Sequence, residues 1–218
     1  MRRSLVALCF LSVALAQAQN LQETHGKTHA QMLGMGYEAW TKFYIGKEGE
    51  STVGMTNAAG LYADALNARN RRLMARLKLT EKVRFTRIHK DLNDFTVNAT
   101  SLGACLTGGG TMWNPIGADM MVRSETALYQ LLAGLTSKAP ARVVSDVTKE
   151  IAALTANVAR TKPEGNWVAV ARDSATDLNK AFAGIVANAK TLPRKDSDLL
   201  LQFCLQTIKD VRETGSPQ

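Results

Sequence analysis

Apolar residues recur along most of this chain at intervals of three and four positions, which is the spacing of one face of an α-helix. The clearest series consists of Phe85, Ile88, Leu92, Phe95, Ala99, Leu102 and Leu106. Similar series occupy residues 32–43, 55–77, 121–135, 144–158, 168–189 and 200–211. The two-residue alternation that predicts strands is absent. We therefore predict an all-α bundle of six to seven helices, mostly antiparallel.

A glycine-rich segment, residues 107–114, interrupts these patterns near the middle of the chain. Its composition predicts a hinge-like connector between two helical halves. Trp113 is expected to fold back from it onto the core. Because Thr, Asn and Asp side chains often cap helix N-termini, we predict helix starts at Thr80, Asn114, Thr161 and Asp196.

The N-terminus has the organisation of a secretory signal peptide. Arg2 and Arg3 precede an apolar run over residues 5–15, and small residues follow at Ala16 and Ala18. The alternative is a membrane anchor, but the run is shorter than the ~20 residues of a spanning helix. We expect cleavage of residues 1–18 after Ala18, leaving a single helical domain of residues 19–218 in a secreted or periplasmic location. No other segment is apolar enough to predict a transmembrane helix.

Two cysteines, Cys105 and Cys204, remain after this cleavage. An even number of cysteines in an oxidising compartment favours a disulfide, so we predict a Cys105–Cys204 bridge. The alternative is a pair of buried thiols that pack as small apolar side chains.

Positive charge is concentrated in one segment. The full chain has a net charge of +8, and loss of Arg2 and Arg3 with the signal peptide lowers it to +6. Residues 69–90 contain nine basic residues and one acid, Glu81, so this segment carries +8 and the rest of the mature chain −2. If the flanking helices form a hairpin, its tip presents a positive surface. The candidate binding residues are Arg69, Arg72, Arg76, Lys78, Lys82, Arg84 and Arg87.

Such a surface attracts anions, so the expected partner is an anionic surface, an anionic polymer or an acidic protein. Nucleic acid is a poor candidate outside the cell, and the segment lacks the interleaved aromatic residues that stack on bases. The alternative interpretation is a solvated helix surface that aids solubility.

A second hypothesis is a metal-binding protein or metalloenzyme. His25 and His29 are four residues apart, which would place both imidazoles on one helix face, and His89 could complete a site. Gly26 lies between the first two, and no third ligand is adjacent in sequence. The motifs of zinc proteases, di-iron bundles and serine hydrolases are absent. The sequence therefore favours a non-catalytic binding or structural module without a cofactor.

Overall fold

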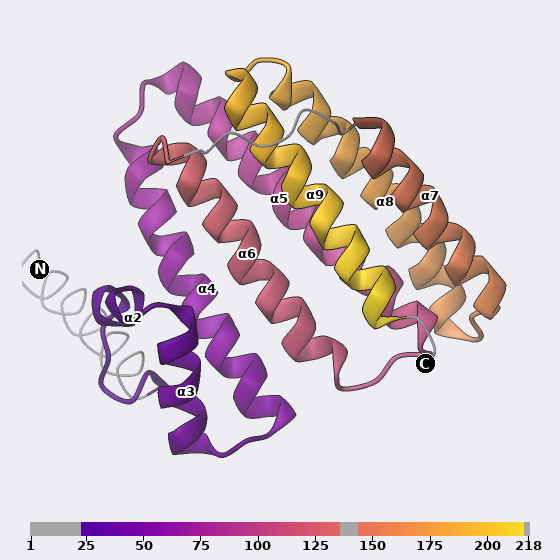
Figure 1. The fold of residues 1–218 in the computed structure, drawn as a ribbon, viewed down its shortest axis with the longest axis horizontal. Coiled ribbons are helices and arrows are strands. Elements are labelled where there is room, and N and C mark those ends of the chain that lie inside the picture. Colours follow the sequence, from indigo (N-terminus) through magenta and orange to yellow (C-terminus); the bar gives the residue numbers. More distant parts are fainter. Residues whose placement is uncertain (1–22, 136–143, 216–218) are drawn as a thin grey trace, which may run out of the picture.

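A computed structural model describes residues 23–135 and 144–215 of the chain (Figure 1). These residues form eight α-helices and no strand, which confirms the all-α prediction. The helices are α2 (His29–Met35), α3 (Tyr37–Glu48), α4 (Thr52–Ala75), α5 (Leu79–Leu106), α6 (Trp113–Leu132), α7 (Val144–Thr161), α8 (Asn166–Ala189) and α9 (Arg194–Thr214). The predicted signal peptide, residues 1–18, lies outside the described residues.

The predicted count of six to seven helices is wrong by one at the N-terminus. A single helix was expected over residues 32–43, but the chain forms α2 and α3 with Gly36 between them. Gly36 has a φ of 80°, a backbone conformation that is incompatible with a continuous right-handed helix. The glycine therefore divides one apolar pattern into two helices.

The predicted helix starts are also wrong in detail. The helices begin at Leu79, Trp113, Asn166 and Arg194, and none of these four starts has a side-chain cap hydrogen bond. Tertiary packing of the apolar faces, rather than capping, sets where these helices begin.

Two hydrophobic clusters hold the helices together. The larger one is built mainly from α5 to α9 and includes the seam of α5, where the residues from Phe85 to Leu102 in the predicted series are all buried. The smaller one joins α2, α3 and α4 and contacts α6 through Val122. In the smaller cluster, Trp40 is fully buried and donates its indole N–H to the carbonyl of Ala58 at 2.7 Å.

Helices that are distant in sequence pair across the molecule. Figure 1 shows α4 beside α6, and α5 packs most extensively along α8. The connector between α5 and α6 therefore joins two helices that have different main partners. Trp113 lies at the end of this connector and is buried in the larger cluster, as expected. A Cβ at Gly103 would lie 2.3 Å from the Trp113 ring, so only glycine leaves room for the indole there.

The predicted disulfide is contradicted: Cys105 on α5 and Cys204 on α9 are both free thiols. Each side chain lies in the larger cluster, where it packs as a small apolar group. Burial raises the pKa of both thiols, which favours their protonated form. Within the described residues, no helix is both long and apolar enough to cross a bilayer.

Candidate anion-binding surface

The end of α4 and the start of α5 carry the basic segment, and a short turn joins them. Arg76 and Lys78 flank this turn as the C-cap residue of α4 and the N-cap residue of α5. Leu77 packs against the larger cluster, so the turn is anchored to the core while its charged neighbours remain outside. Arg72, Arg76, Lys78, Lys82 and Arg87 are all exposed.

The basic side chains around this turn are close together and lack acidic partners among the described residues. None of the seven predicted binding residues forms an ion pair with a carboxylate of the described residues. Several basic side chains in other parts of the molecule are paired, as Lys42 is with Glu38 and Arg172 is with Asp173. Positive charge is therefore available to a partner on the five predicted residues that are exposed: Arg72, Arg76, Lys78, Lys82 and Arg87.

Two of the seven residues are held by the fold instead. The Arg69 guanidinium lies over the Tyr129 ring, 3.4 Å from its centroid, and this cation–π contact ties α4 to α6. Arg84 donates to the carbonyl of Thr191 at 3.3 Å and so ties the start of α5 to the α8–α9 turn. Both side chains are only partly exposed. Arg69 and Arg84 are better explained as packing residues than as contact residues.

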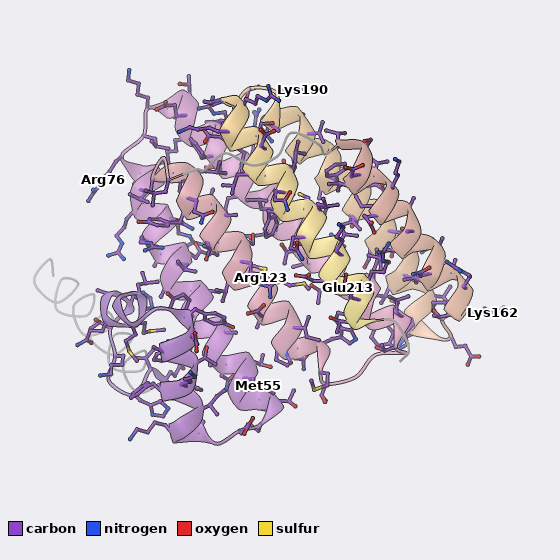
Figure 2. All side chains as sticks on the ribbon, in the orientation of Figure 1. Met55, Arg76, Arg123, Lys162, Lys190 and Glu213 are labelled. Carbon is purple, nitrogen blue, oxygen red and sulfur yellow. The ribbon has the colours of Figure 1, made fainter. Side chains whose placement is uncertain are left out.

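The contact between Arg84 and Thr191 brings a further basic element to the same end of the molecule. Lys190 at the end of α8 and Lys195 in the first turn of α9 are exposed, and Figure 2 shows Lys190 at the same end as Arg76. Arg194 is paired with Asp198 at 3.9 Å. We use "basic end" for seven exposed cations: Arg72, Arg76, Lys78, Lys82, Arg87, Lys190 and Lys195. Sequence reasoning missed the last two because about a hundred residues separate them from the α4–α5 turn.

The three histidines are engaged in separate contacts. His25 lies 2.9 Å from the Glu48 carboxylate and against the Tyr44 ring, at the end of α3. His29 begins α2, and His89 lies on α5. Among the residues that the structure describes, no three His, Cys, Asp or Glu side chains are placed to hold a metal ion together. The geometry thus supplies no observation that favours the metal hypothesis.

His89 belongs instead to a buried polar cluster that the sequence did not indicate. The cluster consists of Asn70, His89, Asn93, Ser124 and Glu125. Glu125 is 1% exposed, and its two carboxylate oxygens contact His89 Nε2 at 2.6 Å and Asn70 Nδ2 at 2.8 Å. Asn70 also donates to the Glu125 backbone carbonyl at 2.8 Å.

A buried carboxylate requires partners of this kind, because an unpaired charge in the interior is strongly unfavourable. The cluster therefore fixes the positions of α4, α5 and α6 relative to one another. His89 Nε2 lies 2.6 Å from the Glu125 carboxylate, which accepts its N–H, and Asn93 Nδ2 lies 3.1 Å from the same nitrogen, so this side of the ring faces protein groups.

A groove of about 790 Å³ lies between α3, α6 and α9, at the level of Met55, Arg123 and Glu213 in Figure 2. Arg123 is the basic residue of its lining, and it is paired with both Asp119, at 2.9 Å, and Asp210, at 2.6 Å. Burial raises the pKa of Tyr37 at the edge of this groove, and the adjacent Asp119 carboxylate adds to the shift. Arg123 is exposed but is paired with two carboxylates, unlike the cations of the basic end.

Comparisons of this chain with protein-family models, with curated proteins and with solved structures gave no significant match.

Proposed function

We propose that this protein is an extracytoplasmic, non-catalytic binding module that contacts an anionic partner or surface through its basic end. The single observation that carries the proposal is the set of exposed cations at the α4–α5 turn that have no carboxylate partner in the described residues. Desolvated or neutralised cations serve folding, whereas exposed unpaired ones produce a field that attracts anions. The extracytoplasmic location rests on the N-terminal sequence of Arg2 to Ala18.

The position of Lys82 gives independent support. It lies near the N-terminus of α5, where the helix dipole is positive and a cation is unfavourable by about 0.3–1 kcal/mol. Arg72, near the C-terminus of α4, suits the dipole of its own helix, but Lys82 does not. The helix dipole therefore explains the position of Arg72 but not that of Lys82, and the proposed binding role explains Lys82.

The proposal is tested with two triple variants that change the net charge equally. Arg72, Arg76 and Lys82 are replaced by Glu in the first variant, and Lys42, Arg172 and Lys180 in the second. All six side chains are exposed. Binding is measured to heparin, as a soluble polyanion, and to vesicles of phosphatidylcholine with phosphatidylglycerol.

We expect the first variant to lose binding to at least one of these anions by about a hundredfold, because each cation near an anionic surface contributes about 1 kcal/mol. The second variant should retain most of the binding, since its side chains lie away from the basic end. Equal losses in both variants would show that only net charge matters. Unchanged binding in the first variant would contradict the proposal.

A further inference from the structure

The outer face of α5 carries two exposed apolar side chains where it leaves the α4–α5 turn. Leu79 is 76% exposed, the highest value for a large hydrophobic side chain among the described residues, and Val83 is 43% exposed. The two residues are one helical turn apart, on the side of α5 opposite the buried positions Ile88 and Leu92. Neither residue belongs to a hydrophobic cluster of the protein.

The surroundings of Leu79 separate it from ordinary exposed residues. A single exposed leucine is common on protein surfaces and needs no explanation. Leu79, however, directly follows Lys78, and Lys82 and Arg87 lie on the same exposed part of α5. The only acid of this segment is Glu81. The turn lies at the edge of the bundle (Figure 1), and the exposure of Leu79 shows that the described fold leaves this side chain largely uncovered.

An apolar tip next to several exposed cations is complementary to the surface of an anionic bilayer. Lysine and arginine side chains are attracted to lipid phosphates, while an apolar side chain at the same level enters the boundary between headgroups and acyl chains. A soluble polyanion offers the same phosphate or sulfate charges without that apolar layer. Charge alone would then suffice, and Leu79 would remain in water.

We infer that the anionic partner of the basic end is a lipid bilayer surface, and that Leu79, followed by Val83, enters its interfacial layer. This inference rests on the proposed function and adds the class of partner to it. The contact is peripheral: the turn dips into the headgroup region and the remainder of the bundle stays in water.

The test uses purified protein and vesicles of phosphatidylcholine with phosphatidylglycerol, with vesicles of phosphatidylcholine alone and soluble heparin as comparisons. Leu79→Ser removes the apolar tip without changing charge. Val53→Ser is the matched control, because Val53 is also exposed, at 68%, but lies at the other end of α4. Binding is measured by co-sedimentation.

We expect Leu79→Ser to weaken vesicle binding by about tenfold, the effect of losing one buried leucine side chain, and to leave heparin binding unchanged. Val53→Ser should change neither. A second pair, Leu79→Trp and Val53→Trp, reports insertion directly: only the former should show a blue shift of tryptophan emission when anionic vesicles are added. The three native tryptophans contribute the same background to both variants.

The outcomes distinguish this inference from the proposed function. Vesicle binding that is unaffected by Leu79→Ser but is lost when Arg72, Arg76 and Lys82 are reversed would overturn the bilayer inference and keep an anionic partner. Tight binding to heparin with no binding to vesicles would also overturn the bilayer inference and keep an anionic partner. If neither the serine variant nor the charge reversal changes binding to any anion, both proposals fail.

Discussion

The basic end and the buried polar cluster hold their charges in opposite ways. Glu125 is 1% exposed, and both of its carboxylate oxygens contact groups on other helices. Arg76 and Lys78 at the α4–α5 turn are exposed and form no ion pair with the described residues. A charge that is fully satisfied inside the protein contributes to folding, whereas one left facing solvent remains available for binding. The contrast predicts that stability and anion binding respond to different substitutions.

The largest stability effect is expected in the buried polar cluster. Glu125→Ala leaves His89 and Asn70 without their shared partner and should lower the free energy of unfolding by about 3–5 kcal/mol. Urea denaturation measures this loss. Glu125→Gln is the matched control: it retains the shape and one acceptor oxygen, so its loss should be smaller. Anion binding by the folded protein should not change in either variant. A loss of binding would contradict the separation of the buried polar cluster, assigned to stability, from the basic end, assigned to binding.

Arg69 provides an intermediate case, because it lies in the basic segment of the sequence but contacts the interior. Arg69→Ala removes the cation–π contact with Tyr129 and should destabilise the protein by about 1–2 kcal/mol. Arg72→Ala, three residues later and exposed, should change stability by less than about 0.5 kcal/mol. Thermal unfolding of the two variants compares them directly. A larger loss of stability for Arg72→Ala than for Arg69→Ala would contradict the assignment of Arg69 to packing and of Arg72 to the exposed surface.

Substitution of Lys82 should change stability and anion binding in opposite directions. Lys82→Glu places a carboxylate near the N-terminus of α5 and reduces repulsion within the basic segment, so stability should rise by about 0.3–1 kcal/mol. Binding to anionic vesicles should fall in the same variant. Chemical denaturation and co-sedimentation, performed on one preparation, measure both quantities. A variant that is less stable and binds as before would contradict the assignment of Lys82 to the basic end.

The smallest effect concerns pH. Desolvation raises the pKa of Asp64 above its ordinary value of 3.8, and repulsion by Glu125 adds to this, although His29 acts in the opposite direction. The folded protein therefore binds this proton more tightly than the unfolded chain, and ionised Asp64 lowers stability as the pH rises above 3.8. Asp64→Asn should raise the Tm slightly at neutral pH and leave it unchanged at ~pH 3, where the carboxyl group is protonated in both the folded and the unfolded chain. A Tm difference that persists at acid pH would point to a cause other than ionisation.

The apolar periodicity explains why much of the architecture was predictable. The seam of α5 from Phe85 to Leu102 is buried as its spacing indicated, since three-to-four spacing identifies a helix face wherever that face is covered. Gly36 was visible in the sequence, but its φ of 80°, and hence the division into α2 and α3, depends on how these helices pack against α4. The helix starts were predicted poorly for the same reason: packing overrides capping preferences.

The candidate surface was predicted only in part. The α4–α5 turn was recognisable because its cations are close together in the chain, and close charges in a hairpin remain close in space. The distinction between Arg69, which stacks on Tyr129, and exposed Arg72 depends on which helix lies beside α4. The Cys105–Cys204 bridge was predicted from a count of cysteines, whereas both thiols are free and packed in the core.

The helical class, the buried faces and the concentration of positive charge at one turn follow from the amino-acid sequence, because these depend on residues within a few positions of one another. The proximity of Lys190 to that turn, through the contact of Arg84 with Thr191, depends on how the helices pack. The contacts of Glu125 with His89 and Asn70 in the interior depend on the same packing. These contacts join helices that are distant along the chain, and local periodicity carries no information about which helices become neighbours.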